Sequence, residues 1–264
     1  MAIDPAAFAL TGRRCVVTGA AQGIGAAVAD AFAACGAAVA VCDRAPEVAA
    51  VADRCAERSG RAAPVGVLDV RDAAAQAAWI AEVGDALGGI DVVVANVGGG
   101  FRAELLDVAP KGRDALVAEN FTSVVDLIQL VVPHMPPPAG PRAGGGSITV
   151  ITSIEAHRAA PGFAVYAAMK SAVANLAMTL ALELADRHVR VNAIAPDMIP
   201  TPGIGPIDVT TPLPYAGDPD DVAAAAVYLA SDAAAFVTGT TVHVDGGTRA
   251  AGGWRRTDGG GWST

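Results

Sequence analysis

A tyrosine and a lysine stand four residues apart in "YAAMK", residues 166–170, inside an alanine-rich run typical of a helix. Because a helix repeats about every 3.6 residues, Tyr166 and Lys170 share one face and their polar ends can converge. A phenol has an ordinary pKa of about 10 and is a poor base at neutral pH. A lysine charge about 4 Å away stabilises phenolate by roughly 4 kcal/mol at an effective dielectric of about 20. The pair therefore predicts a tyrosine whose pKa falls toward about 7 and which accepts a proton from an alcohol.

The elements that must position this pair follow from hydrophobic patterning. Short β-branched segments alternate with longer alanine-rich helical segments, the pattern of a parallel sheet with helices on both faces. Strands are expected at residues 14–18, 38–43, 63–69, 91–96, 147–152, 189–195 and 241–244, and helices starting near Gly23, Pro46, Asp72, Arg113, Phe163 and Asp218. We predict an α/β fold, a single-domain, Rossmann-like, doubly wound parallel sheet of about seven strands.

Composition narrows the class of protein. A chain of 264 residues, 53% hydrophobic and 17% charged, suits one domain. A net charge of −9, with Lys111 and Lys170 as the only lysines, argues against nucleic acid. No apolar run is expected to reach the roughly 18 residues of a membrane helix, and no signal segment is recognised. Neither the cysteines nor the histidines show disulfide or metal-ligand spacing, which predicts a cytoplasmic protein with free thiols and no metal (Cys15, Cys35, Cys42, Cys55; His134, His157, His188, His243).

Ligands of doubly wound sheets bind at the carboxyl ends of the strands, and the first such end is rich in glycine. In "TGAAQGIG", residues 18–25, Gly19 permits a tight turn, Gly23 allows the backbone to approach a pyrophosphate, and Gly25 allows close packing of the following helix. The pattern indicates a dinucleotide site, although a tight turn without a ligand gives the same signal.

Two further strand ends extend the candidate site. Asp43 ends the second strand 24 residues after Gly19, near the spacing of an acid that binds the adenosine ribose and repels a 2′-phosphate. NAD is therefore favoured, while Arg44 keeps NADP possible because a guanidinium can pair with that phosphate. The fourth strand ends in Asn96 and a run of glycines beginning at Gly98, which allows a close backbone approach.

Taken together, these motifs resemble the short-chain dehydrogenase/reductase family over residues 10–248. "TGAAQGIG" is similar to its TGxxxGxG turn, "LDV" (68–70) to its adenine-side Asp-Val, "ANVG" to its NNAG with the first Asn replaced, and "YAAMK" to its YxxxK. Ser153 precedes Tyr166 by the family's 13 residues, "EN" matches its helix asparagine, and "VNAIAPDMIPT" resembles its nicotinamide stretch. The resemblance implies the catalytic residues Asn120, Ser153, Tyr166 and Lys170, and the cofactor residues Gly19, Gln22, Gly23, Ile24, Gly25, Asp43, Arg44, Asp69, Val70, Asn96, Gly98, Tyr166, Lys170, Pro196, Ile199 and Thr201.

The resemblance also implies a mechanism. Tyr166 would exchange the hydroxyl proton as hydride passes between a secondary alcohol and the nicotinamide, Ser153 would bind the reacting oxygen, Lys170 the ribose, and Asn120 a water. The expected enzyme is an NAD(P)-dependent oxidoreductase of an apolar alcohol or ketone, such as a hydroxysteroid or cyclic alcohol, and a homotetramer or dimer. The alternatives are a 3-oxoacyl thioester reductase acting on an acyl carrier protein or CoA derivative, and a non-catalytic dinucleotide-binding regulator.

Several segments depart from the family. The domain is expected to span residues 1–248, with a substrate loop at 197–217 and a tail at 249–264. Asp197 stands where the family has glycine and is either a carboxylate near the reaction or a solvent-facing turn residue. The loop predicts an apolar pocket wall, or else a packed connector, from Ile204, Ile207, Leu213 and Tyr215. Residues 135–146 are expected to form a surface loop away from the chemistry, and the tail, with Trp254 and Trp262, to cap the site, anchor on a neighbouring subunit or be disordered.

Overall fold

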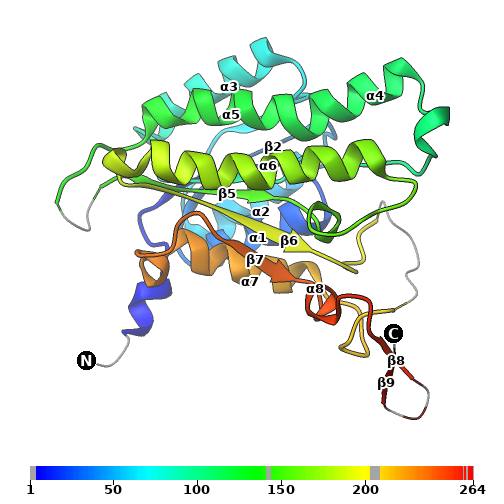
Figure 1. The fold of residues 1–264 in the computed structure, drawn as a ribbon. Helices are drawn as coiled ribbons and strands as arrows, with labels where there is room; N and C mark the ends of the chain where they lie inside the picture. The colour runs from blue at the N-terminus through cyan, green and yellow to red at the C-terminus, as the bar shows by residue number, and fades with distance from the viewer. Residues whose placement is uncertain (1–3, 141–143, 203–208, 258, 260, 264) are drawn as a thin grey trace.

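The protein is built on one parallel sheet, as the computed structural model shows (Figure 1). The structure describes residues 4–140, 144–202, 209–257, 259 and 261–263. Its strands lie in the order β3-β2-β1-β4-β5-β6-β7. They are β1 (Arg14–Thr18), β2 (Ala38–Asp43), β3 (Val65–Val67), β4 (Val92–Ala95), β5 (Gly146–Ile151), β6 (Val189–Pro196) and β7 (Thr241–Val244). The order reverses between β1 and β4, so the predicted doubly wound, single-domain fold is confirmed.

Helices cover both faces of the sheet (Figure 1). One face carries α1 (Gly23–Ala34), α2 (Val48–Ser59) and α7 (Pro219–Ala230). The other carries α3 (Ala73–Leu87), α4 (Pro110–Val117), α5 (Ser123–Val131) and α6 (Ala164–Glu183). Successive side chains of a strand point to opposite faces, so Val17 joins the core beneath α1 and Val16 the core beneath α3. Uninterrupted apolar strands are therefore required, because water reaches neither face.

Two helical segments correct expectations from the sequence. The helix expected near Arg113 begins at Pro110, which suits a first helical position because its missing N–H needs no partner there. It continues into α5 through a π-helical turn at Ala118–Thr122.

By length and composition, Pro110–His134 and Ala164–Glu183 could also cross a membrane, contrary to the expectation that no apolar run is long enough. Both pack on the sheet, where Val131 and Val173 are buried in the core.

The third strand is shorter than residues 63–69. It lies at the edge of the sheet and, among the described residues, pairs only with β2, in a register that ends at Asp43 opposite Val67. The chain then leaves the ladder after one further bond, from the Leu68 amide to the Asp43 carbonyl. Asp69 and Val70 therefore belong to a loop, and this loop runs along the carboxyl edge of the sheet.

Two segments depart from the regular fold at opposite places. The described part of residues 135–146 joins α5 to the amino end of β5, far from the carboxyl edge of the sheet, so the expected remote surface loop agrees with its position (Figure 1). Near the C-terminus, α8 (Thr248–Ala251) leads to a hairpin of β8 (Arg255–Arg256) and β9 (Trp262–Ser263). Trp254 and Trp262 are both exposed there. A domain boundary at residue 248 and a capping role for the tail stay predictions.

The packing of α1 on the sheet can be tested with a matched pair of phenylalanines. Phe32 is fully buried and Phe236 is 94% exposed. We expect Phe32→Ala to lower the free energy of unfolding by about 3–5 kcal/mol, because it leaves a cavity in a close-packed core. Phe236→Ala is expected to change it by less than about 0.5 kcal/mol. Urea unfolding followed by circular dichroism measures both, and equal losses would contradict this account of the core.

Candidate active site

The glycine turn after β1 is packed too tightly for side chains. Gly19 and Gly23 have φ of 66° and 58°, values that favour glycine. A Cβ on Gly25 would lie 2.1 Å from the carbonyl oxygen of Gly19, so the first turn of α1 sits directly on the strand end. The first amides of α1, which begins at Gly23, have no partner within the helix and face the carboxyl edge of the sheet. This geometry suits a phosphate group.

Asn96 and Asp43 hold the turn from either side. The Asn96 side-chain amide donates to the carbonyls of Thr18 and Gly19, at 3.1 and 3.0 Å. The Asp43 carboxylate accepts from the amides of Ala21 and Ala45, at 3.1 and 3.0 Å. Since a carboxylate oxygen has two lone-pair sites, each Asp43 oxygen can still accept a ribose hydroxyl.

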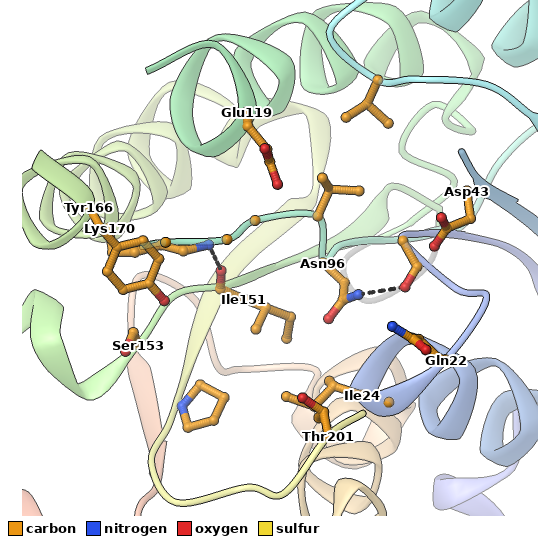
Figure 2. Close-up of a pocket in the computed structure, with 18 of the residues that line it drawn as sticks. Gln22, Ile24, Asp43, Asn96, Glu119, Ile151, Ser153, Tyr166, Lys170 and Thr201 are labelled. Atoms are coloured by element: carbon orange, nitrogen blue, oxygen red, sulfur yellow. Dashed lines mark hydrogen bonds between the residues drawn. The ribbon is translucent and has the colours of Figure 1, made fainter. Parts of the chain in front are cut away.

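One cleft collects nearly all of the predicted site residues (Figure 2). It runs along the carboxyl edge of the sheet, from the end of β2 across β1 and β4 to β5 and β6. Of the residues predicted above, its lining includes Gly19, Gln22, Gly23, Ile24, Asp43, Arg44, Asp69, Val70, Asn96, Gly98, Ser153, Tyr166, Lys170, Pro196, Ile199 and Thr201. Gly25 and Asn120 lie behind the lining.

Lys170 is buried beneath this cleft with its charge directed at the backbone. The whole residue is only 3% exposed, and its Nζ donates to the carbonyl of Ile151 at 3.0 Å (Figure 2). Burial lowers the pKa of Lys170 to about 8, and the nearby Glu119 carboxylate opposes that change. A Cβ on Gly98 would lie 2.3 Å from the lysine Nζ and 2.8 Å from the Asn120 side-chain oxygen, so a larger residue here would displace both side chains.

The predicted fall in the pKa of Tyr166 is wrong for this structure. Burial raises the pKa of the phenol above its ordinary value, a hydrogen bond with Ser153 lowers it, and the charge of Glu155 raises it. The lysine Nζ lies 5.8 Å from the centre of the tyrosine ring and is engaged by Ile151. Desolvation therefore outweighs the attraction that the helical spacing suggests.

The π-helical turn places the side chain of Asn120 against the glycine loop after β4. Its side-chain amide donates to the carbonyls of Gly99 and Leu116, at 2.9 and 3.0 Å, and its oxygen accepts from the Gly99 amide at 3.2 Å. The side chain is fully buried. It thus ties the helix to the glycine loop after β4, and a water held by this residue stays a prediction.

Six charged or aromatic residues of the cleft have no role predicted from the sequence: Glu47, Arg71, Arg102, Glu119, Glu155 and Phe163. Glu119 and Glu155 stand one and two residues from predicted catalytic positions, and that proximity was the available signal. Arg102 and Phe163 come from loops whose course no local pattern predicts. The cleft is therefore more highly charged than expected.

Asp197 faces the cleft, which excludes the solvent-facing alternative. Its side chain is 8% exposed and lies 3.7 Å from the Arg158 guanidinium. Burial raises the pKa of this carboxyl above its usual value. Asp197 therefore places a carboxylate beside the stretch predicted to hold the nicotinamide.

The predicted apolar wall does not form where the structure describes it. Leu213 and Tyr215 are 47% and 60% exposed and do not line the cleft. The Leu213 amide bonds to the Gly246 carbonyl at 3.0 Å, which draws this segment toward the turn after β7. Ile204 and Ile207 lie outside the described residues.

Comparisons with known proteins assign the family. The family model described as enoyl-(acyl carrier protein) reductase matches residues 19–249. An uncharacterized oxidoreductase of Mycobacterium tuberculosis, MT0954, is 39% identical over 91% of this chain and 93% of its own. The 3-oxoacyl-[acyl-carrier-protein] reductase FabG of Thermotoga maritima is 34% identical over 90% and 98%.

Solved structures agree with this assignment. A short-chain alcohol dehydrogenase of Sinorhizobium meliloti matches with TM-score 0.84 at 33% identity, over 92% of this chain and 98% of its own. A 7α-hydroxysteroid dehydrogenase complexed with NADH and a 7-oxo bile acid gives 0.84 at 31%, over 93% and 98%. A Burkholderia cenocepacia short-chain dehydrogenase with NADP gives 0.82 at 31%, over 90% and 98%. The fold and the cleft define a dinucleotide-type oxidoreductase. The chain belongs to the short-chain dehydrogenase/reductase family.

The tight turn makes a specific prediction for Gly25. We expect Gly25→Ala to weaken NADH binding at least tenfold, about 1.4 kcal/mol, because the new Cβ must displace the Gly19 carbonyl. Gly60→Ala is the control for the added methyl group: nothing lies within 4 Å of the Gly60 Cβ position, and its φ of 69°, unlike the backbone of Gly25, is one that favours glycine. Titration of NADH fluorescence measures both variants, and an unchanged affinity in Gly25→Ala would contradict the role of this turn.

Proposed function

We propose that the protein is an NAD-dependent dehydrogenase/reductase that interconverts a secondary alcohol and its ketone. The observation that carries the proposal is that Ser153, Tyr166 and Lys170 share one cleft with the glycine turn and Asp43. The residues present fit the dinucleotide, because the turn excludes side chains where phosphates would lie and Asp43 keeps free lone pairs for a ribose. When bound, the nicotinamide supplies or accepts the hydride.

The chain's own side chains transfer the proton and orient the reacting oxygen. Tyr166 gives its hydroxyl proton to the ketone oxygen in reduction and takes it back in oxidation. Lys170, buried and cationic below its pKa of about 8, stabilises the phenolate left after proton transfer and binds the nicotinamide ribose. Ser153 lies beside Tyr166 and orients the reacting oxygen. No metal enters this scheme.

The preference for NAD rests on charge at the end of β2. The Asp43 carboxylate is held in place by two backbone amides and repels a 2′-phosphate. Arg44 lines the same part of the cleft and is exposed, so it can turn toward solvent. The family itself includes proteins solved with NADH and with NADP. The local carboxylate is the reason for choosing NAD here.

The preference for NAD can be tested by a substitution at Asp43. We expect Asp43→Ser to lower the ratio of NAD to NADP affinity at least tenfold, because repulsion is removed while Arg44 remains, and tenfold corresponds to about 1.4 kcal/mol. Asp53→Ser, on the exposed side of α2, is the control. Calorimetric titration with both nucleotides decides, and an unchanged ratio would assign selectivity elsewhere.

For the substrate, we propose an apolar secondary alcohol or ketone such as a hydroxysteroid or a cyclic alcohol. The likeness to a 7α-hydroxysteroid dehydrogenase supports this class. A second candidate is a 3-oxoacyl thioester, favoured by the likeness to FabG and by the description of the matching family model. The presence of Tyr166, Lys170 and Ser153 in one cleft argues against a non-catalytic regulator, which would need only the dinucleotide turn.

We further propose a cytoplasmic homo-oligomer, a tetramer or a dimer. Met178 and Leu182 lie on α6 and are 49% and 80% exposed, a surface that a second copy would cover. The four cysteines are free, which suits a reducing compartment. The partners expected besides a second copy are small molecules.

The chemistry can be tested with a panel of substrates. Hydroxysteroids, cyclic alcohols and 3-hydroxyacyl thioesters are offered with NAD while absorbance of NADH is followed. We expect turnover of one class, and a loss of about 10²–10⁴-fold in kcat for Tyr166→Phe because it removes the proton donor. Tyr215→Phe is the control, since Tyr215 is outside the cleft. Equal activity of wild type and Tyr166→Phe would remove the catalytic assignment.

A further inference from the structure

Arg102 lies in the loop after β4, close to the tyrosine that is proposed to transfer the proton. A Cβ on Gly100 would lie 3.0 Å from Cγ of Tyr166, so this loop runs against the tyrosine ring two residues before Arg102. Arg102 also lines the cleft. Figure 2 shows Tyr166 and Asp43 on opposite sides of the cleft, and Asp43 belongs to the end proposed for the adenosine. Arg102 therefore lies in the part of the cleft that remains for the substrate.

The stem of the Arg102 side chain is held over the turn that leads into α6. The Ala103 amide donates to the Gly162 carbonyl at 2.9 Å. Gly162 has a φ of 82°, which favours glycine, and a Cβ added there would lie 3.0 Å from Cγ and 3.2 Å from Nε of Arg102. The next residue, Phe163, packs edge-on against Tyr166, with 6.4 Å between the ring centres. The arginine stem and the tyrosine ring are thus both placed by residues 162–163.

The charge of Arg102 is free for a ligand. Within the part of the chain that the structure describes, its guanidinium makes no hydrogen bond or ion pair, and the residue is exposed. The other cations of the cleft are engaged or distant: Lys170 donates to a backbone carbonyl, Arg71 pairs with Asp69, and Arg44 follows β2 at the adenosine end. Because water satisfies an exposed guanidinium, the inference rests on the position of this charge beside the tyrosine.

The loop that carries Arg102 also exposes apolar side chains. Phe101 is 45% exposed, and Leu105 and Leu106, in the short 3-10 turn Leu105–Asp107, are 60% and 97% exposed. An apolar ligand that covers such surface removes it from water, which is favourable. The loss of water also strengthens a neighbouring charge pair. This loop therefore suits a ligand that has an apolar body and one charged group.

The charges around Arg102 favour a carboxylate as that group. A guanidinium offers two parallel N–H donors, which match the two oxygens of a carboxylate. Glu119 and Glu155 also line the cleft, so a phosphate with nearly two negative charges would leave an uncompensated charge near two carboxylates. A net charge of −9 repels anions from the chain as a whole, so an anionic substrate needs a local cation. One guanidinium matches one carboxylate.

We propose that Arg102 is a specificity-determining residue that binds a carboxylate of the substrate, away from the carbon that is oxidised or reduced. This inference deepens the proposed function and rests on it: the substrate is an otherwise apolar secondary alcohol or ketone that also carries a carboxylate. Ser153 and Tyr166 hold the reacting oxygen while Arg102 binds the other end of the molecule. Two fixed points then select which hydroxyl or carbonyl group meets the nicotinamide. The carboxylate itself is not changed in the reaction.

Binding to the complex with NADH tests this inference without turnover. Hydroxysteroids with a side-chain carboxylate, and hydroxycyclohexanecarboxylates, are compared with their methyl esters by titration followed through NADH fluorescence. We expect the wild type to bind at least one of these carboxylates more tightly than its ester. Arg102→Gln is expected to weaken that binding about fivefold or more, the upper range for an ion pair at an exposed site. Binding of the ester should not change, because it has no charge.

Two further variants separate charge recognition from damage to the loop. Arg102→Lys keeps the charge but loses the planar fork, so it should retain part of the preference for the carboxylate. Arg61→Gln is the control, because Arg61 is also exposed but precedes β3 at the amino edge of the sheet. The preference should fall with added salt in the wild type and not in Arg102→Gln. Equal binding of carboxylates and esters by the wild type, or an equal loss of both in Arg102→Gln, would overturn the inference.

Turnover then distinguishes this inference from the proposed function. With NAD, kcat/KM for the carboxylated alcohol should fall about fivefold or more in Arg102→Gln, while kcat/KM for its ester stays the same. A preference for carboxylates in binding, with no turnover of any compound, would count against the proposed function and leave the role of Arg102 intact. A loss confined to 3-hydroxyacyl-CoA thioesters would assign the guanidinium to a phosphate and overturn the carboxylate.

Discussion

The cleft depends on one close contact, between the turn after β1 and the end of β4. The Asn96 side-chain amide reaches the carbonyls of Thr18 and Gly19, and Gly25 packs on the second of these with no room for a Cβ. If a side chain at Gly25 pushed the turn away from the end of β4, the amides at the start of α1 would no longer face the carboxyl edge of the sheet. Because the strand order reverses at this pair, the same contact also opens the crevice that the ligand needs.

Burial decides the electrostatics of the opposite half of the cleft. Lys170 and Tyr166 are near each other, yet desolvation is the largest influence on both, lowering the pKa of the amine and raising that of the phenol. Burial thus shifts each group toward its neutral form. Two carboxylates modulate this balance: Glu119 raises the pKa of the lysine and Glu155 that of the tyrosine, so the predicted catalytic pair belongs to a larger charged network.

Predictability differed between elements for identifiable reasons. Strands β1, β2 and β7 were predicted with their observed bounds, because short β-branched segments and the glycines beside them are local signals. The edge strand β3 was overextended, since its length is set by where β2 stops pairing. The apolar wall expected from Leu213 and Tyr215 failed because the backbone bond of Leu213 to Gly246 directs that segment elsewhere.

The sequence alone determined the sheet architecture, the glycine turn and the spacing of Ser153, Tyr166 and Lys170, because apolar periodicity and short motifs act over a few neighbouring residues. Only the tertiary structure decided which atoms these groups touch. Lys170 bonds to Ile151, 19 residues away, and Asp197 meets Arg158 across two strand ends. Such contacts, and the desolvation that goes with them, depend on how the carboxyl ends of the strands and the loops after them come together at one edge of the sheet. No local sequence pattern encodes that arrangement.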